Sequence, residues 1–474
     1  MTRNAQIVMG LVALRWLAGI AENLGVPNAS EGAALALLVC LVLTALWRTR
    51  IEWTTGLLSA GFLGWILTAV ASAGANPDAA TGPALALIGL LTLYLLLANN
   101  AYPLLATHDA QRQLGRFLVA FIVVGSLLAM SQNLTNLGFV DPTRPDLTRA
   151  IGSDVHPVSF GIQMVAALVA FACLRLKQGG RLGNGIVALW LIGGIALYLT
   201  YARTAWAIGG LCFFALIWSR SGQVGKTVMA LFFPGVALAA ARTDRFEDLK
   251  SMPEFLQSFS FGNPVFDYRF VDNSLSWRIV NWAQGWIQAL ERPLLGWGPG
   301  QSATASNFAL EMHNIFLECF FEGGIFGLAF LLVVIAGLVR LHRQLPKATA
   351  ADRHSRAMAN GFGIGLLLAV TVSTSLVDQL MSFILYLMVL AAAGQPSAAI
   401  NRPQPELRGC CPHRVSDSER IRPGTQRTLL PAHLPRLLQP VVPSSDPRHR
   451  RFRCELADPR SLPGSGEPCR SASE

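Results

Sequence analysis

Charged residues are scarce in this sequence. Only 14% of the 474 residues are Asp, Glu, Lys or Arg, whereas 52% are hydrophobic and the mean hydropathy is +0.43. Soluble domains rarely contain so few charges, so the composition argues against two or three soluble domains. It favours a protein that crosses a membrane several times.

Several chemical signatures are absent as well. The sequence has no metal-ligand spacing, no Walker loop and no GxSxG nucleophile elbow. The long polar segment 242–312 contains no cysteine, so we expect no structural disulfide there. Half of the net charge of +10 lies in the tail after Ala399, so the basic balance is no argument for nucleic-acid binding.

Long apolar runs are what the sequence does contain. A run of about 17 to 25 apolar residues can cross a hydrocarbon core of about 30 Å as a helix, which satisfies its own backbone polar groups. The fold class expected is therefore an all-α integral membrane protein with about twelve transmembrane helices. The predicted spans lie near residues 5–25, 31–47, 53–74, 82–98, 115–136, 157–176, 185–201, 204–219, 224–241, 314–339, 361–377 and 380–397.

The distribution of Lys and Arg predicts how the chain is oriented. If the amino terminus is inside, the inner connectors and Arg3 carry fifteen Lys and Arg, and the short outer connectors carry only Arg144, Arg149 and Arg203. Positive charge is retained on the cytoplasmic side, so both termini are expected in the cytoplasm. The segment 242–312 would then be a large periplasmic loop between the ninth and tenth spans.

These patterns divide the chain into four parts. Residues 1–241 hold spans one to nine, 242–312 form the loop, and 313–397 hold spans ten to twelve. Residues 398–474 are rich in Arg, Pro and Ser without periodicity, which is typical of a disordered cytoplasmic tail. Such text also resembles a GC-rich gene read out of frame, so the tail is assigned no function.

An interfacial helix is expected inside the loop. Asp272, Asn273 and Ser274 are candidate N-caps, and the helix should stop before Pro293. Four apolar side chains at helical spacing form one stripe, typical of a helix at headgroup level. They are Ile279, Trp282, Trp286 and Leu290.

Two candidate functional residues follow from this arrangement. Arg278 lies beside the stripe, and His313 lies at the outer mouth of the tenth span. A neutral imidazole, with an unperturbed pKa near 6.5, can take a proton from an attacking hydroxyl. The structural alternatives are an arginine that only anchors the helix and a histidine whose ring is satisfied by its neighbours.

Two acids lie deeper in the tenth span. Glu318 and Glu322 are four residues apart and share one helix face. Carboxylates at membrane depth are costly and usually face a bundle interior, so both are functional candidates. The alternative is that they form hydrogen bonds that fix helix packing beside the neighbouring glycines.

Further basic residues are expected at the outer face. Arg203 occupies the short connector between spans seven and eight, and Arg149 and His156 flank Gly152 before span six. A cluster of arginines suits a polyanionic headgroup such as a pyrophosphate. Each residue taken alone could equally be an interfacial anchor.

Several short blocks resemble the signature blocks of the O-antigen ligase and polymerase superfamily, and they occur in the same order. The Gly152 to Pro157 stretch is similar to a weaker block of that superfamily. The resemblance covers residues 140–340 by motif and 1–397 by topology. Its main blocks are Arg203-Thr204-Ala205-Trp206, Trp277-Arg278, Pro293 through Gly300, and His313-Asn314 through Gly327.

The resemblance implies a GT-C-like glycosyltransferase of the bacterial inner membrane, with an undecaprenyl-diphosphate-linked glycan as donor. Arg203 and Arg278 would hold the diphosphate, and His313 would activate the acceptor hydroxyl. The diphosphate is a good leaving group whose growing charge arginines can stabilise, so neither a metal, ATP nor another cofactor is expected.

The acceptor is less certain than the donor. A ligase, which would use lipid A-core, is favoured because the chain has one large outer loop, whereas polymerases of the superfamily often have two. A polymerase, a protein O-oligosaccharyltransferase and a non-catalytic assembly subunit stay open. The rival from another class is a twelve-span transporter or lipid flippase, although such proteins often join two six-span halves by a long inner linker that this chain lacks.

Overall fold

The computed structural model describes most of the chain up to residue 394. The predicted tail, 398–474, lies outside the described residues, as does the predicted ninth span beyond residue 230. The described ranges are 3–46, 56–76, 81–105, 107–141, 144–154, 156–178, 184–230, 247–264, 274–305, 311–372 and 380–394.

Helices dominate the described residues. They occupy the positions of all the predicted spans except the ninth, of which residues 223–230 are helical. The first half contains α1 (Arg3–Asn23), α2 (Ala29–Leu46), α3 (Gly56–Ala75), α4 (Thr81–Leu96), the π-helical turn η2 (Leu97–Ala101), α5 (Tyr102–Leu105) and α6 (His108–Thr135). The second half contains α7 (Pro157–Lys177), α8 (Asn184–Leu199), α9 (Arg203–Arg220), α11 (Glu247–Ser258), α12 (Ser274–Ala289), α13 (Ile315–Gln344), α14 (Ala350–Val372) and α15 (Leu380–Gly394).

Six helices are long and apolar enough to cross a membrane. They are α3, α4 with its π-helical turn, α6, α7, α13 and α14. Three shorter apolar helices cover 29–43, 186–199 and 380–394. These lengths support a membrane protein that crosses the bilayer several times.

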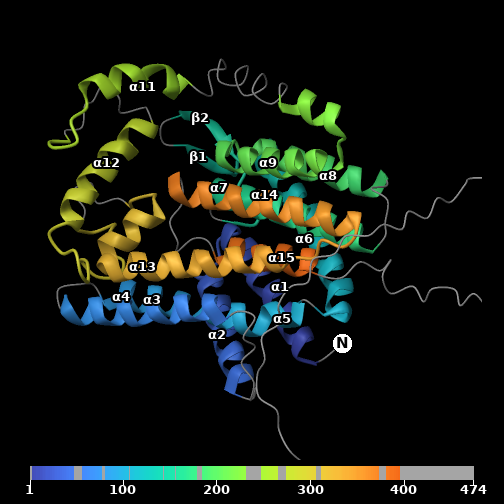
Figure 1. Cartoon of the computed structure of the whole chain (residues 1–474), viewed down its shortest axis with the longest axis horizontal. Helices are drawn as coiled ribbons and strands as arrows, with labels where there is room; N and C mark the ends of the chain where they lie inside the picture. The colour runs from blue at the N-terminus through green and yellow to red at the C-terminus, as the bar shows by residue number, and fades with distance from the viewer. Residues whose placement is uncertain are drawn as a thin grey trace, which may run out of the picture. The chain divides into compact units, whose positions relative to one another are not determined.

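The helices α7 and α15 form the centre of the bundle. They pack against each other, and nearly every residue of both is buried. A helix that is apolar on all sides is expected in such a position, because no face of it needs water or lipid. Small residues such as Ala166, Ala167 and Ala170 allow the neighbouring helices to approach closely. Around this pair, α13 lies along α3 and α14 lies along α9 (Figure 1).

A short β-hairpin departs from the all-α expectation. Strand β1 (Phe139–Asp141) pairs antiparallel with β2 (Arg144–Arg149), with Phe139 opposite Arg149. The sequence of β2 has no alternation of apolar and polar residues, so the pairing was not visible in it. The hairpin ends just before the turn that leads into α7.

Helix α14 begins well before the predicted start of its span at residue 361. Its first turns carry Asp352, whose carboxylate accepts a hydrogen bond from Lys177 at the end of α7. Both side chains are buried. Because each of these buried charges has a partner, the helix can include polar residues before the apolar span begins.

The described part of the loop 242–312 contains two helices. Helix α12 matches the predicted interfacial helix, whereas α11 was not predicted. Trp282 packs against the amino-terminal part of α13, and Trp286 and Leu290 each remain 52% exposed. Part of the apolar stripe of α12 therefore packs on α13, whereas Trp286 and Leu290 remain largely exposed.

Candidate functional site

His313 lies directly before α13, outside the helix. Asn314 is the N-cap, and its side-chain oxygen accepts hydrogen bonds from the backbone N–H groups of Phe316 at 3.1 Å and Leu317 at 3.2 Å. The cap marks the beginning of the helix at Ile315, and the chain turns just before it, where His313 has a left-handed φ of +49°. Few residues other than glycine adopt this conformation, although His and Asn do so more often than most.

Aromatic and basic side chains surround the imidazole of His313. Its ring lies edge-on to Trp277, with the ring centroids 5.4 Å apart. Arg278 and His156 are close enough to act on it electrostatically. Its Nδ1 atom is buried and makes no hydrogen bond to any described residue. Because buried polar atoms normally have partners, this nitrogen is open to a ligand.

Arg278 reaches the site from α12. Its guanidinium lies over the Trp277 ring, 5.3 Å from the centroid. Two hydrogen bonds fix α12 to the segment before His313: Trp282 Nε1 donates to the Met312 carbonyl at 2.6 Å, and Asn281 Nδ2 donates to the Glu311 carbonyl at 3.0 Å. Helix α12 therefore holds Arg278 beside His313.

His156 joins the site from the start of α7. Its Nδ1 accepts a hydrogen bond from the Val158 N–H at 3.2 Å, so the side chain is the N-cap of α7. Arg149 and Arg278 both act on it electrostatically. Arg149, at the end of β2, donates from Nε to the Thr200 carbonyl at 3.0 Å. The structure thus brings together four of the sequence-predicted residues, Arg149, His156, Arg278 and His313.

The two histidines of the site are held in the neutral form. Burial is the main cause that lowers the pKa of His313 from 6.5 to about 4, and the neighbouring Arg278 and His156 contribute to the same shift. Burial also lowers the pKa of His156 to about 4, with help from Arg149 and Arg278. Both rings are therefore uncharged near pH 7 and can accept a proton.

Arg203 stands at the edge of this group. It is the first residue of α9, is exposed, and lies three residues after Thr200, whose carbonyl Arg149 contacts. The connector before it is tightly built, because Trp206 Nε1 donates to the Leu197 carbonyl at 2.8 Å and the Ala202 N–H donates to Thr200 Oγ1 at 3.1 Å. A shared role for Arg203 and Arg278 in holding one diphosphate stays a prediction.

The turn before α7 is held by a residue that sequence reasoning missed. Gln132 of α6 accepts hydrogen bonds at Oε1 from the N–H groups of Ile151 at 3.0 Å and Gly152 at 2.7 Å. Its Nε2 donates to the Gly152 carbonyl at 3.0 Å. Gly152 has φ +56°, and a Cβ there would lie 2.2 Å from the Phe160 ring. This bonding sets the positions of Arg149 and His156 on the two sides of the turn.

The glycine-rich loop 293–302 packs on a break in α13. Gly324 has φ +61° inside the helix, which interrupts its hydrogen bonds. The loop satisfies the freed groups: Trp297 N–H donates to the Phe321 carbonyl at 2.8 Å, Gly298 N–H to the Glu322 carbonyl at 3.1 Å, and Ile325 N–H to the Pro293 carbonyl at 2.8 Å. Irregular backbone at this depth is tolerated because protein groups pair with it.

Helix α3 completes this packing with two polar residues that sequence reasoning also missed. Ser72 donates to the Leu295 carbonyl, and Asn76 Nδ2 donates to the Gly296 carbonyl at 3.2 Å. Asn76 Oδ1 accepts a hydrogen bond from Arg292, which also lies over Trp297 at 4.2 Å. The only sequence signal for Ser72 is a polar residue inside an apolar span, and Asn76 lies just after the end of that span.

The two acids of α13 are buried as the sequence analysis expected, with Glu318 6% and Glu322 8% exposed. Glu322 Oε1 accepts hydrogen bonds from both the backbone and the hydroxyl of Ser302. This contact supports a structural role for Glu322, in which its hydrogen bonds fix the packing of the loop on α13, over a direct role in the reaction. Glu318 lies one turn nearer to His313.

The comparison with protein families agrees with these motifs. The family described as O-antigen ligase matches residues 186–332, which run from α8 to α13 and include Arg203, Arg278 and His313. No curated protein sequence matches the chain. The matched segment, together with the membrane-spanning helices, supports the similarity of this chain to the O-antigen ligase and polymerase superfamily.

Proposed function

We propose that the protein is an O-antigen ligase, a membrane glycosyltransferase that moves a glycan from undecaprenyl diphosphate to a hydroxyl of lipid A-core. The observation that carries the proposal is the environment of His313. A neutral imidazole with a buried, open Nδ1 lies beside Arg278, within the segment that matches the O-antigen ligase family. This is a proton acceptor next to a cation that can bind phosphate.

The reaction assigned to these residues is a single displacement. The acceptor hydroxyl oxygen bonds to the anomeric carbon while its proton passes to His313. The bond from that carbon to the diphosphate oxygen breaks, and the lipid diphosphate leaves with the electron pair. Arg278 and Arg203 stabilise the charge that grows on the diphosphate, and Arg149 and His156 line the same group. No metal, ATP or other cofactor takes part.

The proposed topology has twelve spans in the bacterial inner membrane, with both termini in the cytoplasm. Residues 1–241 would hold spans one to nine, 242–312 the periplasmic loop, 313–397 spans ten to twelve, and 398–474 a cytoplasmic tail. The bias of Lys and Arg towards the inner connectors supports this orientation. The site around His313 then faces the periplasm, where lipid-linked glycan and lipid A-core would both be available.

The test is transfer by the purified protein. We expect that the protein, given undecaprenyl-diphosphate-linked glycan and lipid A-core without nucleotide or metal, yields glycosylated core. Lengthening of the lipid-linked glycan instead would identify a polymerase. If no product forms with any acceptor, the proposal that the protein is an enzyme is wrong, and a transporter or an assembly subunit remains.

Variants of the two central residues make this test specific. His313→Asn is the preferred base deletion, because Asn tolerates the left-handed φ of +49° and removes only the proton acceptor. We expect transfer to fall about 10² to 10⁴-fold. Arg278→Lys keeps the charge but loses the fork of two donors, so it should weaken donor binding. Arg220→Lys, an exposed residue at the other end of α9, is the matched control.

A further inference from the structure

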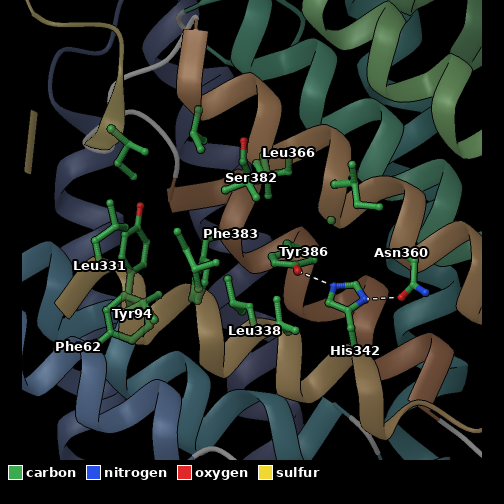
Figure 2. A pocket seen from close by; sticks show the side chains of 18 of the residues that line it. Phe62, Tyr94, Leu331, Leu338, His342, Asn360, Leu366, Ser382, Phe383 and Tyr386 are labelled. Carbon is green, nitrogen blue, oxygen red and sulfur yellow. Dashed lines mark hydrogen bonds between the residues drawn. The ribbon is translucent and has the colours of Figure 1, made fainter. Parts of the chain in front are cut away.

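A cavity lies among α3, α4, α13, α14 and α15. It has a volume of about 370 Å³, within the range of roughly 300 to 1,000 Å³ that is usual for small-molecule sites. Most of its lining is aliphatic or aromatic, including Phe62, Leu338 and Phe383. Figure 2 shows Phe62, Tyr94 and Phe383 towards one side of the cavity and His342 with Asn360 at the other.

A hydrogen-bonded group of polar side chains lies at one end of this cavity. His342 Nδ1 lies 2.9 Å from Asn360 Oδ1, and His342 Nε2 lies 2.6 Å from the hydroxyl of Tyr386 (Figure 2). Both ring nitrogens are thus used by protein groups. Arg343 and Arg356 line the same end. It is remote from His313, because about 30 residues of α13 at about 1.5 Å each separate Arg343 from it.

The arginines at this end are not neutralised by the cavity itself. The described residues that line it include no Asp or Glu. One guanidinium nitrogen of Arg356, NH1, is buried and has no hydrogen-bond partner among the described residues. The acid one helical turn away, Asp352, is already bonded to Lys177 and to the Thr349 N–H. Two cations at the mouth of an apolar cavity therefore call for an anionic group with an apolar tail.

Ile315, at the start of α13, also lines the cavity. The part of the apolar lining next to the arginines fits one leaflet. From Leu331 to Arg343 the axis of α13 advances about 18 Å, and half of a hydrocarbon core of about 30 Å is about 15 Å. We infer that the cavity binds one anionic phospholipid, with its phosphodiester on Arg343 and Arg356 and an acyl chain along Leu338 and Leu366. Basic pockets between membrane helices are known to bind such headgroups. The inference does not depend on the proposed glycan transfer.

Two arginines on the same helices offer a matched control. Arg340 of α13 and Arg353 of α14 precede Arg343 and Arg356 by three residues, are exposed, and do not line the cavity. The double variants R343Q/R356Q and R340Q/R353Q remove the same charge from the same end of the protein. Only the first removes it from the cavity.

The experiment is native mass spectrometry of the full chain in detergent, with added dioleoyl phosphatidylglycerol or dioleoyl phosphatidylcholine. We expect one tightly bound phosphatidylglycerol, weakened about tenfold or more in R343Q/R356Q, as for lost charge-assisted hydrogen bonds. R340Q/R353Q should bind as the wild type does. Leu366→Trp, which fills the cavity, should lose the lipid while keeping both arginines.

Three results would overturn the inference: equal binding of phosphatidylcholine, equal loss in both double variants, or retention of the lipid by Leu366→Trp. A tightly held polyprenyl lipid in place of the phospholipid would also overturn it, since the cavity would then serve the donor. If R343Q/R356Q unfolds, the single variant Arg343→Gln carries the same comparison, because Arg343 is exposed.

Discussion

Ser302 donates two hydrogen bonds to a single carboxylate oxygen, Oε1 of Glu322, from its backbone N–H at 3.2 Å and from its hydroxyl at 2.7 Å. These bonds fasten the end of the glycine-rich loop to α13, two residues before the kink at Gly324. Glu322 is therefore expected to position the loop beside the site, and a role in proton transfer would need an oxygen that these bonds leave open.

Glu322→Gln should destabilise the protein by about 1 to 3 kcal/mol, because the amide replaces one of the two buried carboxyl oxygens with an NH2 group that needs an acceptor. Ser302→Ala removes only the hydroxyl and should cost about 1 kcal/mol. Thermal unfolding in detergent measures both. Glu254→Gln, at an exposed position of α11, is the control. Unchanged stability of Glu322→Gln together with lost transfer would assign the carboxylate to the chemistry instead.

Gly324→Ala should lower the stability by more than about 2 kcal/mol. The residue has φ +61°, and a Cβ there would lie 2.2 Å from the carbonyl carbon and oxygen of Leu294. Gly89→Ala in α4 is the matched control, since nothing lies within 4 Å of its Cβ position. Alanine favours a helix over glycine by up to about 1 kcal/mol, so the control should be neutral or stabilising. Equal melting temperatures for the two variants would show that the kink is not required.

The pH dependence of transfer follows from the electrostatics of His313. Its pKa is lowered to about 4, so the ring is neutral and active as a base above that pH. The acid limb of kcat/KM, which reports the free enzyme, should lie near pH 4. Removing a neighbouring positive charge raises the pKa, so Arg278→Gln should move this limb to higher pH.

Arg220→Gln, which changes an arginine far from the site, should leave the limb of the pH profile where it is in the wild type. An acid limb that stays in place in Arg278→Gln would mean that another group, and not His313, controls the profile. The readout is the position of the limb rather than the rate, so loss of donor affinity in the variant does not obscure it.

The buried pair of Lys177 and Asp352 allows a double-mutant test. Lys177→Met alone leaves a buried carboxylate without its ammonium partner and should cost about 3 to 5 kcal/mol. Adding Asp352→Leu removes the stranded charge and should restore most of the loss. Melting temperatures of the two single variants and the double variant measure the coupling. Simple addition of the two single losses would mean that the residues do not depend on each other.

The sequence predicted the helical part of the fold well for a simple physical reason. An apolar run of span length has only one conformation that satisfies its backbone in lipid, so α3, α7 and α13 were visible without any knowledge of packing. The start of α14 was predicted too late, because its polar first turns depend on Lys177, a residue far away in the chain. The β1–β2 hairpin was missed since its short strands carry no apolar alternation.

The candidate site was predictable only in part. His313 and Arg278 could be identified because placing a polar side chain next to an apolar membrane segment costs free energy, and such residues usually have a function. The break at Gly324 could not be read from the sequence, because glycines in a span equally allow close helix packing. The contributions of Ser72, Asn76 and Gln132 depend on which helices meet, and a single sequence does not specify that.

The hydrogen bonds of α3 have a consequence for how the protein is made. Ser72 contacts carbonyl groups 223 and 250 positions later in the chain, and Asn76 contacts one 220 positions later. While the ribosome is still synthesising the first nine helices, these distant carbonyl groups are not yet present, and of the two donors Asn76 can bond only to the nearby Ser72 carbonyl. The packing of α3 against the glycine-rich loop and the start of α13 can therefore form only late in synthesis, and a nascent chain that stops before residue 322 would lack it.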